Sequence, residues 1–133
     1  MSSPANQTAR RVMLVDDSNT IRSSAARYLT QAGCDVITAA DGFDALGKLS
    51  ECDPELIFVD MLMPRLDGLQ TCALIKHHPR FRETPVIMLS SRDDIFDRAR
   101  GRTAGADDYL AKPFSRESLV HAVETHPLER KAA

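Results

Sequence analysis

The stretch Glu-Leu-Ile-Phe-Val-Asp-Met-Leu-Met-Pro-Arg-Leu-Asp-Gly, residues 55–68, indicates how the rest of the chain folds. Its four consecutive apolar residues, 56–59, are typical of a β-strand that is buried on both faces. Asp60 ends this run, Pro64 disfavours a longer strand, and the final Asp-Gly pair is a turn signal. We therefore expect Asp60 at the carboxyl end of a buried strand, where parallel α/β sheets bind their ligands. An aspartate that merely ends a strand is the alternative, and the rest of the chain must decide between the two.

The length and charge of the chain exclude several classes of protein. With 133 residues, it has room for one domain of ordinary size. Its 17 Lys and Arg against 19 Asp and Glu give a net charge of −2, so electrostatics favours neither nucleic acid nor an acidic membrane as a partner. The chain contains no apolar run of roughly 18 residues and no signal peptide, which predicts a cytoplasmic protein without membrane insertion. The three cysteines match no zinc-ligand spacing and are expected to be reduced thiols.

Apolar runs and helical repeats alternate five times along the chain. We expect strands at residues 12–15, 34–39, 56–60, 85–90 and 107–111. Helices should follow each strand, and the clearest capping residues at their starts are Ser18, Asp41 and Ser115. In the helix expected over 68–78, one stripe contains Leu69, Cys72, Ala73 and Lys76. The domain should span residues 11–126, between a disordered tail at 1–10 and a short tail at 127–133.

Strands that alternate with helices predict a parallel α/β sheet with helices on both faces. Right-handed crossovers then lead to a flavodoxin-like, doubly wound, five-stranded parallel sheet of order 2-1-3-4-5 with five helices, in a single domain. In that order the first and third strands are neighbours. Asp16 and Asp17 follow the first strand and Asp60 ends the third, so three carboxylates should converge in one crevice.

Three carboxylates at close range require a cation, because like charges raise each other's pKa unless a positive charge relieves them. Mg²⁺ suits such a site, since it takes one or two carboxylates and keeps places for water and a phosphoryl oxygen. Ser90 ends the fourth strand and Lys112 follows the fifth, which adds a hydroxyl and an ammonium group to the same rim. The set fits an aspartate nucleophile that accepts a phosphoryl group with metal assistance. Pro113 makes the Lys112–Pro113 bond a candidate cis peptide.

Four motifs of the chain resemble those of the receiver domains of bacterial two-component response regulators. They are Val-Asp-Asp-Ser at 15–18, the stretch at 55–68, Met-Leu-Ser-Ser at 88–91 and Lys-Pro-Phe at 112–114. The resemblance covers residues 10–126 and implies that Asp60 is the phosphoacceptor and a histidine kinase the donor. It also implies that the chain is no conventional enzyme and catalyses only its own phosphorylation and dephosphorylation.

The resemblance assigns roles to further residues. Asp17 would bind Mg²⁺ directly, Asp16 through a coordinated water, and the remaining ligands would be Asp60 and the backbone carbonyl of Leu62. Lys112 would bind the phosphoryl group, while Ser90 would be the switch hydroxyl and Tyr109 the switch aromatic. Phosphorylation should then change the face made by the helix at 93–103, the strand at 107–111 and the last helix.

Within the family, the runs at 33–39, 41–46, 71–76 and 84–91 resemble single-domain regulators of the chemosensory systems that control type IV pili and twitching motility. This likeness implies a chemotaxis-type kinase and a downstream protein target in the pilus machinery or motor. Flagellar chemotaxis regulators are the alternative. Leu62 stands where those regulators commonly have a polar residue, and Arg92 where they have an acid. Both residues flank the phosphorylation site and are expected to tune the lifetime of the phosphoryl group.

Three other readings of the acidic motif remain open. A phosphohydrolase with an Asp-x-Asp motif is disfavoured, because Ser18 and Asn19 occupy the positions where the second aspartate would stand. A flavin-binding flavodoxin is disfavoured because Asp16 and Asp17 would repel the flavin phosphate. A pseudo-receiver that binds partners without being phosphorylated is disfavoured by the complete set of acidic, hydroxyl and lysine side chains.

Overall fold

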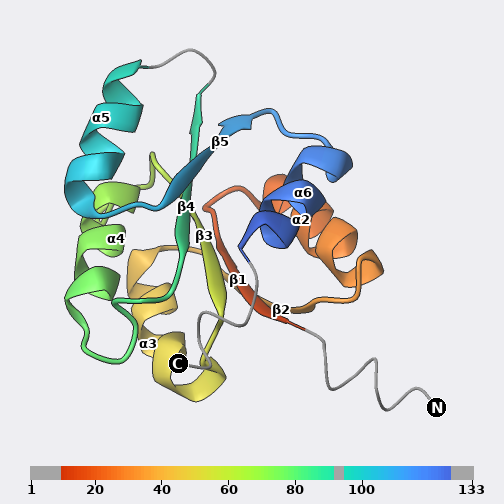
Figure 1. The fold of residues 1–133 in the computed structure, drawn as a ribbon, viewed down its shortest axis with the longest axis horizontal. Helices are drawn as coiled ribbons and strands as arrows, with labels where there is room; N and C mark the ends of the chain where they lie inside the picture. Colours follow the sequence, from red (N-terminus) through yellow and green to blue (C-terminus); the bar gives the residue numbers. More distant parts are fainter. Residues whose placement is uncertain (1–9, 92–94, 127–133) are drawn as a thin grey trace.

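The fold has three layers, with a parallel sheet between two layers of helices (Figure 1). The computed structural model describes residues 10–91 and 95–126. In chain order, the elements are β1 (Arg11–Val15), α2 (Asn19–Gln31), β2 (Asp35–Ala39), α3 (Gly42–Cys52), β3 (Leu56–Asp60), α4 (Gly68–His77), β4 (Val86–Ser91), α5 (Ile95–Ala104), β5 (Asp108–Lys112) and α6 (Arg116–Thr125). Arg92 and nearly all of both predicted tails lie outside the described residues.

The sheet has the strand order β2-β1-β3-β4-β5, and every neighbouring pair is parallel. The predicted order and the predicted fold class are therefore confirmed. Helices α2 and α6 cover one face of the sheet, while α3, α4 and α5 cover the other (Figure 1). Alternate residues of each strand consequently enter two separate cores, as Phe58 and Val59 of β3 do.

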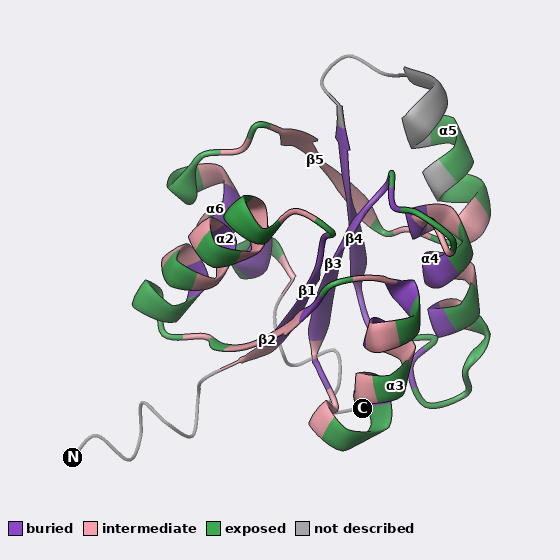
Figure 2. Cartoon of the chain, turned by 180° about the vertical axis from the view of Figure 1, so that it is seen from behind, coloured by how far each residue is buried: buried purple, intermediate pink, exposed green. Residues whose placement is uncertain are grey.

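Strand β3 is buried at all five of its positions, and Figure 2 shows it as buried at the centre of the molecule. Continuous burial explains why its sequence is an unbroken apolar run, since both faces of a parallel sheet are covered by helices. Val15 pairs with Val59 in the register of β1 and β3. Asp16, the residue after β1, and Asp60, the last residue of β3, therefore lie side by side at the carboxyl edge of the sheet.

Polar side chains cap the helices where the sequence predicts caps. Ser18, Asp41 and Ser115 each accept a hydrogen bond from a backbone amide in the first turn of the following helix. Asp67 does the same for α4 and forms a reciprocal capping box with Gln70. The helices of the described ranges include none that is long and apolar enough to cross a membrane.

The buried residues of helix α4 overlap only in part with the stripe named from the sequence, of which Leu69 packs partly buried against the core. These buried residues are Gly68, Thr71, Cys72 and Ile75, so only Cys72 of the predicted stripe is fully buried. The Lys76 ammonium instead spans the end of the helix, donating to the carbonyl of Thr84 and to Asp107 Oδ2, both at 2.7 Å. Gly68, at the first position of the helix, lies close to the backbone of β3.

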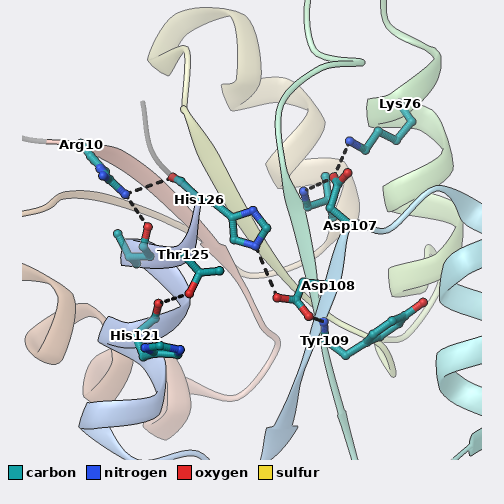
Figure 3. A network of polar contacts seen from close by, with 10 residues as sticks. Arg10, Lys76, Asp107, Asp108, Tyr109, His121, Thr125 and His126 are labelled. Carbon is teal, nitrogen blue, oxygen red and sulfur yellow. Dashed lines mark hydrogen bonds and ion pairs between the residues drawn. The ribbon is translucent and has the colours of Figure 1, made fainter. Parts of the chain in front are cut away.

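Strand β5 begins at Asp108, one residue later than predicted, and the preceding Asp107 makes side-chain contacts to two other elements. Its Oδ2 accepts from Lys76 and from the amide of Val86, at 2.7 and 2.9 Å. On the other side, His126 Nε2 lies 3.4 Å from Asp108 Oδ2 (Figure 3). The start of β5, and with it Tyr109, is thus held from α4 and from the end of α6.

Candidate functional site

Three carboxylates meet at the carboxyl ends of β1 and β3. Asp16, Asp17 and Asp60 each offer an oxygen, and these oxygens all lie within 4.8 Å of one another. Asp16 is fully buried and Asp60 is 5% exposed, whereas Asp17 is exposed. The predicted convergence is confirmed, and it follows from the register that places the ends of the two strands together.

The Lys112 ammonium lies between two of these carboxylates. It is 3.1 Å from Asp16 Oδ2 and 3.1 Å from Asp60 Oδ1. The other oxygen of Asp16 accepts from the amide of Ser18 at 2.9 Å. Lys112 is the last residue of β5, and the peptide bond that follows it is cis, as the sequence predicted. The cation thus neutralises part of the negative charge that the strand ends bring together.

Burial and charge shift the pKa of both partners of this ion pair. Burial, together with the charge of the neighbouring Asp16, raises the pKa of Asp60 to about 6, although Lys112 and the Leu62 amide act to lower it. Burial lowers the pKa of Lys112, but attraction to Asp60 and Asp16 outweighs it, so the net shift is upward. At neutral pH the ammonium is therefore charged, and Asp60 is mostly ionised and accessible to an electrophile.

A pocket of about 240 Å³ opens at this rim. It is lined by Asp60, Met61, Leu62, Leu89, Ser90 and Lys112. Ser90 is 4% exposed and follows Leu89, the β4 residue that pairs with Asp60. The nucleophile, the hydroxyl and the ammonium predicted from the sequence therefore share one pocket.

The loop after Asp60 presents Leu62 to solvent, and the side chain of Leu62 is 71% exposed. Its neighbours Met61 and Met63 are both buried in the core. Arg65 anchors the loop to the start of α3, with Nη2 2.6 Å from Asp41 Oδ2. Leu62 thus lies at the mouth of the pocket on an anchored loop.

Tyr109 lies away from the pocket, on the same sheet. It is half-buried against the core on the α3–α4–α5 side and pairs with Met88, whereas Ser90 pairs with Ala111. The switch role expected of Tyr109 would therefore require movement of the loop that carries Ser90. Arg92, the second residue predicted to tune the lifetime, belongs to the residues that the structure does not describe.

Gly68 is a site residue that the sequence indicated only as a turn. A Cβ atom at this position would lie 2.1 Å from the carbonyl oxygen of Asp60 and 2.8 Å from the Cα of Met61. The Gly68 amide also donates to the carbonyl of Met61 at 3.0 Å. Glycine therefore allows α4 to begin directly against the backbone of the candidate nucleophile.

The donor set fits a hard divalent cation. Carboxylate oxygens are the ligands that Mg²⁺ prefers, and Asp17 leaves one side of the site open to solvent. The exposed position also leaves room for the waters that Mg²⁺ retains. An acidic triad of this kind is typical of the metal site in receiver domains.

The chain belongs to the response regulator receiver domain family, whose model matches residues 12–124. It is similar to Protein PilG of Pseudomonas aeruginosa, with 60% identity over 116 residues, covering 87% of this chain and 86% of that protein. Response regulator MprA of Mycobacterium avium is 39% identical over 110 residues, which are 83% of this chain and 47% of MprA.

Solved structures give the same family. Chemotaxis protein CheY4 of Vibrio cholerae superposes with a TM-score of 0.85 at 31% identity, covering 89% of this chain and 98% of that one. A response regulator of Chloroflexus aurantiacus reaches 0.85 at 35% identity, covering 88% and 96%. Receiver domains are signalling modules with a histidine kinase as partner, so the phosphohydrolase and flavodoxin readings are wrong.

In the metal-free protein, the titration of Asp60 should raise the free energy of unfolding as the pH falls from about 7 to about 4. The pKa of Asp60 is about 6 in the folded chain, whereas that of an unperturbed aspartate is 3.8. A raised pKa means that the folded state binds the proton more tightly, so its stability falls as the pH rises through 6. Through the titration of Asp60, the protein should be less stable at neutral pH, by roughly 2–3 kcal/mol, than at a pH where Asp60 is protonated in both the folded and the unfolded state.

Urea unfolding in a chelator at several pH values measures this contribution. Asp60→Asn is the matched control, because it keeps the shape of the side chain and cannot titrate. The wild-type protein should gain stability on acidification relative to the variant. Parallel pH profiles for the two proteins would contradict the prediction.

Proposed function

We propose that this chain is a phosphoacceptor response regulator that receives a phosphoryl group on Asp60 from a histidine kinase in a Mg²⁺-dependent reaction. One observation carries the proposal. Asp60 shares a 4.8 Å cluster with Asp16 and Asp17 while Lys112 reaches it at 3.1 Å. Three carboxylates and an ammonium group thus meet at one edge of the sheet, which is the set of groups that a metal-assisted transfer to an aspartate needs.

The residues have separate roles in the proposed transfer. A carboxylate oxygen of Asp60 forms a bond to phosphorus while the bond from phosphorus to the donor histidine breaks, and its electron pair returns to the imidazole. Bound Mg²⁺ would neutralise charge on the carboxylates and the phosphoryl oxygens. Asp17 would hold the metal directly, Asp16 through water, and the Leu62 carbonyl would complete the protein ligands. Lys112 would exchange a carboxylate partner for a phosphoryl oxygen.

Ser90 and Tyr109 are proposed to transmit the event. Phosphorylation adds charge and acceptor oxygens to the pocket that Ser90 already lines. Donation from its hydroxyl would draw the β4 end inward and let the half-buried Tyr109 turn further into the core. The surface formed by α5, β5 and α6 would then change shape and be recognised by a partner.

For the pathway, we propose control of type IV pili and twitching motility from the cytoplasm. The support is the 60% identity to PilG, against 31% to chemotaxis protein CheY4 of Vibrio cholerae, which has the same fold. A chemotaxis-type kinase would be the donor, and a protein of the pilus machinery or motor the target. A flagellar chemotaxis role remains the alternative. Labelling with the kinase of each pathway separates the two, since the cognate kinase should transfer much faster.

The proposed chemistry is tested by incubating the protein with Mg²⁺ and a small phosphodonor and measuring intact mass. A gain of about 80 Da, one HPO₃, that is localised to Asp60 supports the proposal. A chelator should prevent the gain. No gain from either a small donor or the cognate kinase would instead favour the pseudo-receiver.

The phosphoryl group should be lost faster when Leu62 becomes asparagine. Hydrolysis needs a water in line behind the phosphorus, and Leu62, 71% exposed at the pocket mouth, offers that water no hydrogen bond. Leu62→Asn combined with Arg92→Glu should speed decay by about 10-fold, equivalent to roughly 1.4 kcal/mol of barrier. The decay of the mass-labelled protein measures the rate.

Leu74→Asn is the matched control for this prediction. Leu74 is also an exposed leucine, 48% exposed, but it lies on α4 away from the pocket lining. The phosphorylated Leu74→Asn variant should lose its phosphoryl group at the wild-type rate. A double variant at Leu62 and Arg92 that decays at the wild-type rate would remove the basis for a lifetime role.

A further inference from the structure

Arg22 lies one turn into α2 and reaches back to the strand end that carries the acidic pair. Its Nη1 donates to the main-chain oxygen of Asp16 at 2.6 Å. Its Nη2 donates to Asn19 Oδ1, which holds the guanidinium against the start of the helix. The sequence pattern did not indicate this residue, because a helical arginine is ordinarily a solvated surface charge.

The contact acts on the peptide that joins the two acidic residues. The oxygen that Arg22 binds belongs to the peptide between Asp16 and Asp17, while the Asp16 amide donates to the Ala39 carbonyl at 3.1 Å. The Asp16 carboxylate is fully buried and held by Ser18 and Lys112. Asp17 is exposed, so the plane of the preceding peptide is a main determinant of where its carboxylate points.

We propose that Arg22 is a positioning residue, which fixes the Asp16–Asp17 peptide so that both carboxylates face one cation site. The proposal rests on the proposed Mg²⁺-dependent function. Partners that orient the ligands of a metal contribute strongly to its affinity, although they do not touch the metal. Here the partner is a guanidinium on a main-chain carbonyl, anchored by the rigid first turns of a helix.

The positive charge of Arg22 and its positioning role have opposite effects on the affinity for Mg²⁺. Replacing Arg22 therefore distinguishes between them. A guanidinium near a divalent cation site repels the cation, so removing it should strengthen Mg²⁺ binding if charge alone mattered. Positioning predicts that the same change weakens binding. Alanine is also the best helix former, so Arg22→Ala does not weaken α2 through its intrinsic propensity.

Titration with Mg²⁺, followed by the backbone amide signals in NMR, measures the affinity. Arg22→Ala should bind Mg²⁺ about 10-fold more weakly than the wild type. Arg22→Lys keeps the charge and one donor for the Asp16 carbonyl, and should recover part of the affinity. Arg27→Ala removes an exposed charge from the same helix and should leave the affinity unchanged or slightly higher.

Hydrogen exchange in the metal-free protein gives a second, independent measurement. The amides of Asp17 and Ser18 should exchange faster in Arg22→Ala, while core amides of β3 should exchange as in the wild type. Arg27→Ala should change neither. Unchanged exchange at Asp17 and Ser18, or tighter Mg²⁺ binding in Arg22→Ala, would overturn the proposal. Failure of the wild-type protein to bind Mg²⁺ would overturn the proposed function, and the exchange comparison would still decide the role of Arg22.

Discussion

Asp60→Asn should abolish the mass gain of about 80 Da that Mg²⁺ and a small phosphodonor produce in the wild-type protein. The amide of asparagine is nearly the shape of the carboxylate but is a far weaker nucleophile. Of the three clustered carboxylates, only Asp60 lines the pocket beside Ser90, and it lies 3.1 Å from Lys112. We therefore expect complete loss of labelling rather than a slower reaction.

Two controls separate this result from a general disturbance of the fold. Asp35→Asn removes an exposed carboxylate on β2 and should be labelled like the wild type. Metal-free Asp60→Asn should be more stable than the wild type at neutral pH, because the pKa of about 6 shows that burial and Asp16 disfavour the charged form of Asp60. A well-folded Asp60→Asn protein that still gains the phosphoryl mass would refute the assignment.

Gly68→Ala should damage both stability and phosphorylation. The added methyl would lie 2.1 Å from the Asp60 carbonyl oxygen, a distance that requires the backbone of α4 or β3 to move. Such overpacking typically costs about 1–3 kcal/mol, and a rigid backbone obstacle places this site at the upper end of that range. Movement of β3 would also displace Asp60 from Lys112, so the rate of labelling should fall together with stability.

Gly47→Ala is the matched control for this substitution. Gly47 lies within α3, and a Cβ atom there would meet nothing within 4 Å. The variant should be more stable than the wild type by roughly 0.5–1 kcal/mol, since alanine favours the helix. Urea unfolding of both variants checks the prediction. Equal stability of the Gly68 and Gly47 variants would mean that the start of α4 can shift freely.

Much of the molecule could be predicted from the order of its residues. Alternating apolar runs and helical repeats determined the class of fold, because a strand buried on both faces has no polar position to interrupt it. The same pattern predicted that Asp16, Asp17 and Asp60 would meet, since the carboxyl ends of parallel strands lie along one edge. Local capping chemistry likewise predicted the starts of α2, α3 and α6.

The tertiary structure decided the features that depend on contact across elements. Thr71 and Ile75 of α4 are buried although the stripe named from the sequence did not include them, and Gly68 packs against Asp60, a contact that helical periodicity does not encode. Strand β5 began a residue later than predicted, and the side chain of the preceding Asp107 bonds to α4 and β4. In both cases the contact joins different elements of the fold.

The electrostatic properties of the site likewise depend on the tertiary structure. A sequence shows that Asp60 is an aspartate and Lys112 a lysine, but neither the 3.1 Å between them nor the pKa of Asp60 follows from that. Both depend on how far the surrounding chain excludes water and on the register of the strands. These properties result from the packing of all five strands together. The identity and order of the chemical groups were therefore local properties of the sequence, whereas their distances, burial and charge were decided only when the chain folded.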